Sequence, residues 1–374
     1  MASYFGRTVK VSTFGASHGQ AIGGVVDGLP CGFPVNLETL QAFLKRRAPG
    51  QHQLQTQRKE ADIPEFQSGL VQGRLSGSPL AFTIQNTSQR SGDYDNLRDV
   101  PRPSHADYTA RMRYGEYVDM RGGGHFSARL TAPVCVAGGI AIQLLESIGI
   151  HVRAHLAQVG TVPDTSIDYT NPPMDKLASI STEAIPMLDP VQRHTAEQLV
   201  LELKTSGDST GGIVEVFATG LPVGMGNPNY DGIENRLGVT LFGMPAVKGI
   251  SFGSGFPGCA FRGSKQNDPF IITEESVRTE KNNSGGIQGG ITNGMPLVMQ
   301  VGIKPTPSIY HEQNSVSLSN LSAEVLQIQG RHDPCVALRA VPVVEALTAL
   351  VILDFVLEHD PRVFRHFSHP ALEV

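Results

Sequence analysis

Two long stretches of the chain carry apolar residues at almost every position. In residues 129–148, Ala132, Val136, Ile140 and Leu144 recur at a spacing of four, which predicts a helix that tolerates Pro133 in its first turn. Residues 337–358 predict a second helix, with a proline near its start. Because neither stretch has a polar face, we expect both helices to be buried in the centre of the protein.

Shorter segments are rich in β-branched residues and are bounded by turn formers, which predicts strands. The expected strands are residues 8–14, 21–26, 80–84, 151–159, 213–219 and 295–303. Further helices are expected at 37–47, with Asn36 as the N-cap, at 195–204 and at 235–242. Residues 161–192 are rich in Pro, Asp, Ser and Thr, which suggests an excursion or lobe. The whole pattern favours a single α+β domain spanning residues 1–374, with helices covered by antiparallel or mixed sheets.

Composition narrows the class of protein. Only 17% of the 374 residues are charged, whereas 41 are Gly and 25 are Pro, so much of the backbone is expected in turns and close-approach loops. A formal charge of -5 argues against a nucleic-acid partner. The four cysteines are widely spaced and are expected to be reduced. The N-terminus does not resemble a signal peptide, and we expect no 18-residue apolar stretch, no membrane association and a cytoplasmic location.

The stretch MRGGGHFSARLTAP places three consecutive glycines before the first apolar helix. An isolated run of this kind is as often a flexible turn as a site. Here Ser127 and the amides of the helix N-terminus could cradle an anion, with Arg121 and Arg129 on either side. A phosphate or a flat cofactor ring lying against bare backbone would explain the missing side chains.

A second glycine-rich stretch, residues 284–294, precedes the strand expected at 295–303 and the motif KPTPSI. Neither segment matches a dinucleotide-binding or P-loop fingerprint. The stretch could be a glycine-rich hairpin. Its pairing with Lys304, Thr306 and Ser308 instead favours contact with a phosphate.

Two histidines lie in tight polar loops, His18 in TFGASHGQ and His105 in RPSHADY. A loop histidine is usually just exposed to solvent, but His is also the usual proton donor and acceptor at neutral pH. A third cluster precedes the second apolar helix and contains Asp333 and Arg339, which could equally form a simple ion pair. Arginines in several glycine- and proline-framed loops predict a small, multiply anionic ligand.

Six motifs, TFGASHG, RPSHADYT, RGGGHFSAR, GGIQGGITNG, KPTPSI and RHDPCVALRAVPVVEA, occur in this order along the chain. As a set they resemble the chorismate synthase family from end to end. The resemblance implies loss of phosphate and a C6 proton from 5-enolpyruvylshikimate 3-phosphate by anti-1,4-elimination, with reduced FMN (FMNH2) as cofactor and no net redox change. It also implies a β-α-β sandwich, a homotetramer and a separate flavin reductase as the source of reduced FMN.

The resemblance also assigns roles to residues. It implies that His18 protonates the reduced flavin, that His105 is the acid near the departing phosphate, and that Asp333 helps to relay the proton from flavin N5. The implied substrate-binding residues are Ser17, Arg47, Arg102 and Arg129. The implied flavin-binding residues are His125, Phe126, Ser127, Ala246, Gly289, Lys304, Pro305, Thr306, Pro307, Ser308 and Arg331.

Several positions depart from the pattern common in the family. Ala16 stands where many members have Glu, Gln53 where many have Arg, and HFSARL where many read RSSARE. None of these changes removes an implied proton-transfer residue, although Gln53 and Leu130 alter the expected charge network. Two other classes use similar loops: an FMN-binding regulatory protein without turnover, and a flavin oxidoreductase that consumes NADPH. The missing dinucleotide fingerprint counts against the second.

Overall fold

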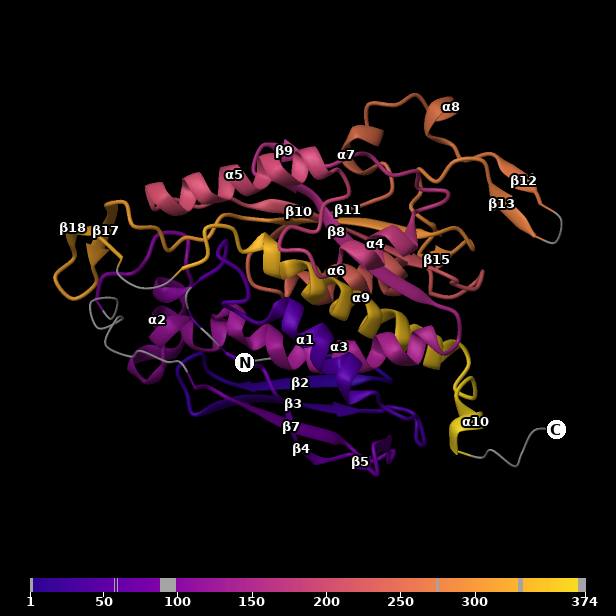
Figure 1. Cartoon of the computed structure of the whole chain (residues 1–374), viewed down its shortest axis with the longest axis horizontal. Helices are drawn as coiled ribbons and strands as arrows, with labels where there is room; N and C mark the ends of the chain where they lie inside the picture. Colours follow the sequence, from indigo (N-terminus) through magenta and orange to yellow (C-terminus); the bar gives the residue numbers. More distant parts are fainter. Residues whose placement is uncertain are drawn as a thin grey trace.

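Two five-stranded antiparallel sheets enclose a layer of helices in the computed structural model (Figure 1). The structure describes residues 3–56, 58, 60–87, 99–273, 276–328 and 332–368. The first sheet has the order β1 (Tyr4–Phe5), β2 (Lys10–Gly15), β3 (Ala21–Asp27), β7 (Leu80–Gln85) and β4 (Glu65–Ser68). The second has the order β11 (Val247–Phe252), β16 (Leu297–Ile303), β10 (Gly212–Thr219), β8 (His151–Val159) and β9 (Val162–Pro163).

The helical layer and the peripheral elements complete the fold. The longer helices are α1 (Leu37–Arg47), α2 (Asp107–Tyr114), α3 (Thr131–Glu146), α4 (Met174–Ile180), α5 (Pro190–Ser206), α6 (Ile233–Phe242) and α9 (Ala337–His359). Short helices are α7 (Gly255–Gly258), α8 (Gly263–Gln266) and α10 (Arg365–Ser368). Two-stranded pairs are formed by β5 (Leu70–Val71) with β6 (Arg74–Leu75), β12 (Phe270–Ile272) with β13 (Val277–Thr279), β14 (Ile287–Gln288) with β15 (Ile291–Thr292), and β17 (Gln313–Ser317) with β18 (Ser322–Leu326).

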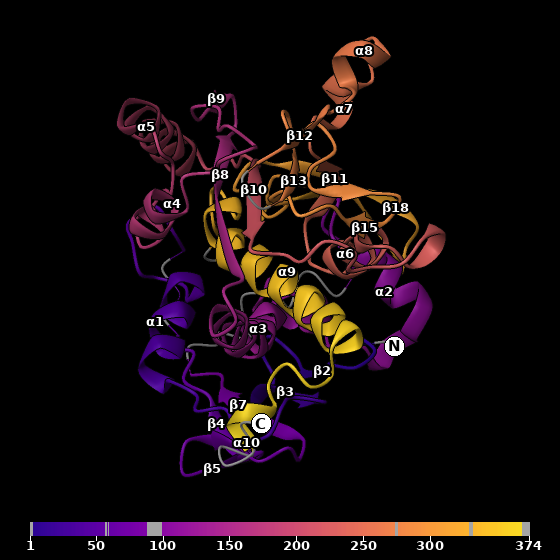
Figure 2. The same ribbon diagram turned by 90° about the vertical axis from the view of Figure 1, so that its right-hand side faces the viewer.

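Helices α3 and α9 form the centre of the sandwich, as the apolar patterning predicts (Figure 2). One cluster of buried apolar side chains includes residues of both sheets and of both helices. The expected α+β sandwich is therefore confirmed. The expectation that no apolar stretch is long enough to span a membrane was wrong: Ala128–Glu146 and Ala337–His359 pass that test by length and composition. Their most apolar windows are 78% and 100% buried, as in core helices.

Most predicted elements occur with ends displaced by a few residues. Asn36 caps α1 by accepting a hydrogen bond from the Thr39 amide at 2.9 Å. Helix α5 begins earlier than predicted because Asp189 caps it and Pro190 occupies its first turn. Strands β4 and β11 were not predicted, since their short, glycine-containing or polar segments lack a clear alternation.

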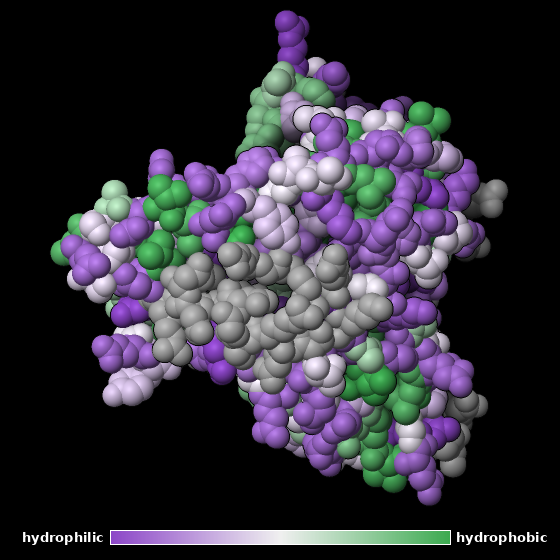
Figure 3. Space-filling model, turned by 60° about the vertical axis from the view of Figure 1, so that its left-hand side comes forward, coloured by the Kyte–Doolittle hydropathy of each residue, from purple (hydrophilic) through white to green (hydrophobic). Residues whose placement is uncertain are grey.

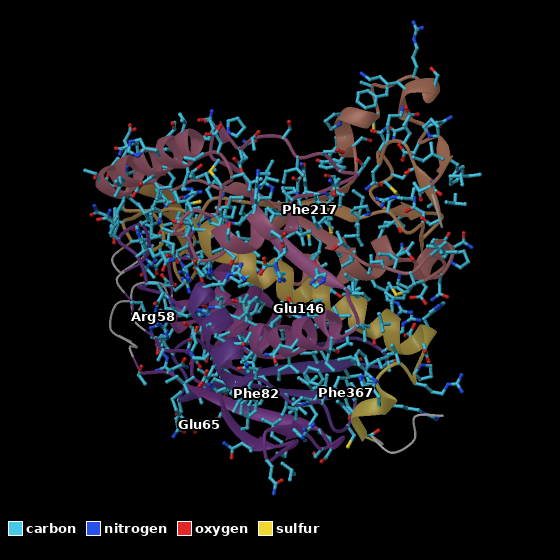
Figure 4. The ribbon with its side chains drawn as sticks, turned by 45° about the vertical axis from the view of Figure 1, so that its right-hand side comes forward. Arg58, Glu65, Phe82, Glu146, Phe217 and Phe367 are labelled. Carbon is cyan, nitrogen blue, oxygen red and sulfur yellow. The ribbon has the colours of Figure 1, made fainter. Side chains whose placement is uncertain are left out.

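The polar segment expected as an excursion packs against the outer face of the second sheet. Phe217 on β10 lies in a small apolar cluster with Leu177 of α4 and Val298 of β16. Figure 4 places Phe217 in this sheet and Phe82 in the first sheet, with the long helices between them. The segment therefore covers the sheet and does not mark a break in the fold.

The N-terminal strands are anchored to the end of α9 by one buried carboxylate. Asp354 accepts hydrogen bonds from the backbone amides of Arg7, Thr8 and Val9, at 2.7 to 3.2 Å. Its side chain is also paired with Arg236 at 3.3 Å. This anchor fixes the start of the chain, whose residues Ser3–Phe5 line the cavity described below.

All four cysteines are free thiols. Cys135 and Cys335 are buried in the core, and burial raises the pKa of both thiols to about 12. Neither is therefore a thiolate at neutral pH.

The close crossing of α3 and α9 gives a test of the central layer. A Cβ added to Gly138 would lie 2.5 Å from the Cα of Ala346, so Gly138→Ala should destabilise the protein by about 1 to 3 kcal/mol through overpacking. Gly238, in α6, has no heavy atom within 4 Å of its added Cβ, and Gly238→Ala should stabilise by up to about 1 kcal/mol. Urea unfolding at one protein concentration measures both. Equal effects of the two substitutions would contradict the tight crossing.

Candidate functional site

A cavity of about 800 Å³ lies where the first turns of α3 and α9 meet the ends of several loops. Figure 3 shows the molecule from the side to which these first turns point, where hydrophilic side chains prevail. The described candidate residues that line the cavity are Ser17, His18, Arg47, Arg102, His105, His125, Phe126, Ser127, Arg129, Ala246, Lys304, Thr306, Pro307, Ser308 and Asp333. Segments far apart in the sequence therefore form one site.

The three consecutive glycines form a turn between the two candidate histidines. Gly122, Gly123 and Gly124 have φ values of 61°, 86° and 54°, a region that disfavours every residue with a Cβ. A Cβ on Gly122 would overlap the His18 ring and lie 2.8 Å from Ser17 Oγ, and one on Gly123 would lie 3.2 Å from His105 Nε2. Two imidazoles fill the space beside Gly122 and Gly123, and a Cβ on Gly124 would overlap the Asp119 carbonyl, so contacts within the chain already exclude side chains here. That a phosphate or a cofactor ring also lies against this turn stays a prediction.

His18 lies at the end of β2, in a turn that is bonded to the glycine turn. The Ser17 amide donates to the Gly124 carbonyl at 3.0 Å, which joins the two turns. The Ser17 hydroxyl lies 3.2 Å from His18 Nδ1 and accepts from the Arg58 guanidinium at 3.2 Å. His18 is 6% exposed, so its ring is positioned by backbone and not by solvent.

His105 belongs to a compact network with Arg102 and Asp107. Asp107 Oδ1 lies 2.7 Å from His105 Nδ1, and Arg102 donates to both oxygens of the carboxylate at 2.7 and 2.8 Å. Arg102 Nη1 also donates to Ser308 Oγ at 3.2 Å. Burial lowers the pKa of His105, and the positive charges of Arg102 and Lys304 lower it further, against the opposing effect of Asp107. His105 is therefore neutral at pH 7 before an anion arrives.

Two buried arginines share one carboxylate at the floor of the cavity. Asp62 accepts from Arg129 Nη1 and lies 3.4 Å from Arg47 Nε. Burial lowers the pKa of Arg47 to about 10, with smaller contributions from neighbouring arginines, so the group is still charged at neutral pH. Arg47 Nε and Nη2 have no hydrogen-bond partner among the described residues. Buried unpaired donors of this kind are expected where an anionic ligand supplies the missing acceptor.

Asp333 connects this floor to the start of α9. Its oxygens accept from the Thr56 amide at 2.9 Å and from Arg339 Nη1 at 2.7 Å. Arg339 in turn donates to the Arg47 carbonyl at 2.9 Å. The ion pair that the sequence suggested here exists, and it also positions a carboxylate that lines the cavity.

The segment after β16 supplies a cation and hydroxyls on the opposite wall. Thr306 Oγ1 is buried and has no hydrogen-bond partner among the described residues. The Lys304 amide donates to the Ala246 carbonyl at 2.9 Å, and burial together with Lys248 lowers the pKa of the Lys304 amine. Ala246 has φ of 74°, a conformation that costs a residue with a Cβ about 1 to 2 kcal/mol. Strain of this kind is typical of functional sites.

His125 points across the glycine turn and has both nitrogens engaged. Nδ1 lies 2.7 Å from the Gly15 carbonyl, which can only accept, so this nitrogen carries the proton. Nε2 then accepts from the Ser3 hydroxyl at 2.7 Å. His125 thus ties the N-terminus to the wall of the cavity.

Two of the described candidates, Gly289 and Pro305, do not line the cavity. Gly289 lies in the exposed turn between β14 and β15, so the segment forms the glycine-rich hairpin that the sequence offered as an alternative, and its contact with a phosphate stays a prediction. Strand β16 separates this hairpin from Lys304 by its length, about 20 Å for seven residues. Pro305 is exposed and is not a lining residue, and Arg331 lies outside the described residues. Arg121 pairs with Asp119 at 2.8 Å and is not a lining residue either.

Several charged residues of the site were not singled out from the sequence. Glu60 accepts from Arg58 at 2.8 Å and from Thr87, and Asp62 binds the two buried arginines. Burial alone would raise the pKa of Asp62, but Arg47 and Arg129 outweigh it and lower that pKa. Asp107 directly follows the motif residues His105 and Ala106. Residues 58–62 show only a cluster of charges of both signs, which is equally typical of a solvated loop.

Comparisons with known proteins agree with this geometry. A sequence profile of the chorismate synthase family matches residues 9–357. The chain belongs to the chorismate synthase family. It is 42% identical to the chorismate synthase of Lancefieldella parvula over 365 residues (95% of this chain and 96% of the relative), and 43% identical to that of Thermococcus gammatolerans over 352 residues (94% and 97%). A crystal structure of a chorismate synthase superposes with a TM-score of 0.74 at 26% identity and covers 98% of this chain and 99% of its own.

Three positions that depart from the family pattern differ in burial and in their distance from the cavity lining. Leu130 lines the cavity and is 8% exposed, so the wall is apolar where many chorismate synthases have Glu. Gln53 is exposed, and its backbone carbonyl accepts from Lys204. The Ala16 carbonyl accepts from Asn86 at 3.1 Å, a contact that does not depend on the side chain at position 16.

The glycine turn gives a direct test of the site. Gly122→Ala should displace His18 and lower chorismate formation on the order of 100-fold, a typical cost of misplacing a reacting group. Gly149→Ala is the matched control, since Gly149 also has positive φ, 79°, but its added Cβ meets no atom within 4 Å. Initial rates at saturating ligands measure both. Similar rates for the two variants would show that the packing of His18 against the turn is not needed.

Proposed function

We propose that this protein forms chorismate by the anti-1,4-elimination of phosphate and the C6 proton from 5-enolpyruvylshikimate 3-phosphate, with reduced FMN bound in the same cavity. The observation that carries the proposal is the convergence of His18 and His105 on one glycine turn, in a cavity whose other walls hold buried arginines. This reaction requires two proton-transfer groups and cationic side chains that bind a polyanion.

The cavity is lined by two chemically different sets of side chains. The lining contains cations, among them Arg47, Arg102, Arg129 and Lys304, which suit a ligand with two carboxylates and a phosphate. The lining also has apolar side chains from the N-terminal strand, the glycine turn and the end of α6: Tyr4, Phe5, Phe126, Val239, Phe242 and Met244. A volume of about 800 Å³ lies in the upper range for ligand pockets, which suits a flavin and a substrate together.

The residues present fit reduced FMN. The unpaired Thr306 hydroxyl, with Lys304 and Ser308, would hold polar groups of the cofactor, and Phe126, Ser127, His125 and Ala246 would contact its ring system. Arg331 and, from a second copy of the chain, Gly289 remain proposed flavin contacts. When bound, reduced FMN supplies electron density that helps phosphate to leave and recovers it as the C6 hydrogen departs, so no net redox change results.

The residues of the chain perform the remaining tasks. Arg47 and Arg129 hold the anionic groups of the substrate with donors that are pre-oriented by Asp62. His105 and Arg102, next to Ser308, meet the departing phosphate, and His105 protonates it. With reduced FMN bound, His18 would donate a proton towards it, and Asp333 would help to relay the proton that is released. The buried walls exclude water, which strengthens each of these charge interactions.

An anaerobic assay with photoreduced FMN and purified protein tests the proposal through chorismate absorbance. His105→Ala should lower turnover on the order of 100-fold or more, the scale for loss of an acid or base group. His18→Ala should do the same and leave FMN affinity largely intact. His151→Ala, at an exposed position of β8, is the control and should keep wild-type turnover.

The proposal is contradicted if wild-type protein binds FMN and substrate but forms no chorismate, as a regulatory protein would. Consumption of NADPH with net flavin turnover would instead favour an oxidoreductase. We further propose a cytoplasmic homotetramer that receives reduced FMN from a separate reductase. Light scattering tests the assembly, and addition of NADPH to the purified protein with oxidised FMN should produce no reduction.

A further inference from the structure

We propose that Asp107 is a positioning residue that fixes the tautomer of His105 and the plane of the Arg102 guanidinium. The inference rests on the proposed function, in which those two groups meet the departing phosphate. Asp107 itself does not line the cavity, so it acts through the residues that do.

The carboxylate of Asp107 is almost fully used by these two neighbours. Oδ2 accepts from the Arg102 backbone amide at 3.0 Å and from Arg102 Nε at 2.7 Å. Oδ1 accepts from Arg102 Nη2 at 2.8 Å and lies 2.7 Å from His105 Nδ1. Asp107 is 5% exposed and lies in the first turn of α2, where a negative charge is favourable. A bidentate pair of this kind leaves the guanidinium little freedom to rotate.

The distances also decide the tautomer of His105. Nδ1 lies 2.7 Å from Asp107 Oδ1 and 3.1 Å from Arg102 Nη2, and it cannot donate to the first and accept from the second at once. Arg102 outweighs the effect of burial and lowers the pKa of Asp107, so the carboxylate is ionised and can only accept. If Nδ1 were unprotonated, its lone pair would face a lone pair of Asp107 Oδ1 at 2.7 Å. Arg102 Nη2 does not need Nδ1 as an acceptor, because it already donates to Asp107 Oδ1. Nδ1 therefore carries the proton.

The lone pair of Nε2 then faces the glycine turn, where a Cβ on Gly123 would lie 3.2 Å from that nitrogen. In this state His105 accepts a proton from a protonated phosphate group on arrival, and the imidazolium is stabilised by Asp107. The same proton returns to the phosphate as its C–O bond breaks. Proton uptake and release balance, and His105 ends neutral.

A second dyad outside the cavity provides a matched control. His155 Nδ1 lies 3.0 Å from Asp164 Oδ2, and His155 Nε2 lies 3.1 Å from Glu215 Oε2, on the outer face of the second sheet. His155 is fully buried and does not line the cavity. Asp164→Asn thus removes the same kind of His–carboxylate contact as Asp107→Asn, at a place where no substrate binds.

The tautomer is tested by long-range proton–nitrogen NMR correlations on protein with 15N-labelled histidine. The His105 signals are assigned by their absence from His105→Gln. We expect protonated Nδ1 and unprotonated Nε2 in the wild type, and a changed tautomer in Asp107→Asn. The wild-type result does not depend on whether Asp107→Asn folds. An unprotonated Nδ1 in the wild type would overturn the inference.

Kinetics supply the second readout. Asp107→Asn should lower kcat/KM on the order of 100-fold, and it should shift the pH limb governed by His105 to lower pH. The direction follows because Asp107 raises the pKa of His105, whereas Arg102 and Lys304, the other charged groups that act on it, both lower it. Asp164→Asn should leave rate and pH limb unchanged and lower only stability.

Wild-type kinetics and an unmoved pH limb in Asp107→Asn would overturn the positioning role. If the wild type binds ligands and forms no chorismate, the proposed function fails, and the NMR spectra still decide whether Asp107 sets the tautomer. The two failures are therefore distinguishable.

Discussion

The close packing of two imidazoles against one bare backbone turn is the constraint on which the site depends. Gly122 leaves room for His18 and Gly123 leaves room for His105, so one turn sets the positions of both rings. The turn is itself held by the Ser17 amide and by His125, which bonds to Gly15. Because it directly precedes the 3₁₀ turn Ala128–Leu130 and α3, the position of the histidines is tied to the most buried layer of the fold. Rigid support of this kind is what precise proton transfer needs.

Buried cations in the cavity are held by carboxylates that do not fully satisfy them. Asp62, Asp107 and Asp333 each pair with arginines, which offsets part of the cost of removing those charges from water. Arg47 Nε and Nη2 nevertheless make no hydrogen bond among the described residues, although Nε forms an ion pair with Asp62. The pairs therefore orient guanidinium groups while leaving capacity for a ligand. Loss of one carboxylate would leave an unpaired buried charge, so the same residues matter for stability and for binding.

The sequence predicted the layers better than it predicted the contacts. The apolar runs identified α3 and α9, because a helix that is buried on every side is apolar at almost every position. The glycine turn was found, but the packing of His18 against it was not, since no local pattern shows a contact between residues more than 100 positions apart. Gly289 and Lys304 were placed together, although the extended strand between them keeps them apart. Asp107 was missed because its partners are defined by side-chain geometry.

The charged groups around Arg129 explain why position 130 holds an apolar residue. Leu130 lines the wall beside Arg129, whose guanidinium already binds Asp62 and the Asn86 side chain at 3.0 Å. A carboxylate at position 130 would add a further negative charge to a cavity that has to attract a polyanion. With leucine there, the first turn of α3 keeps the positive end of its helix dipole uncompensated. The departure from the family pattern therefore changes how the positive charge is distributed and leaves both imidazoles and their glycine turn untouched.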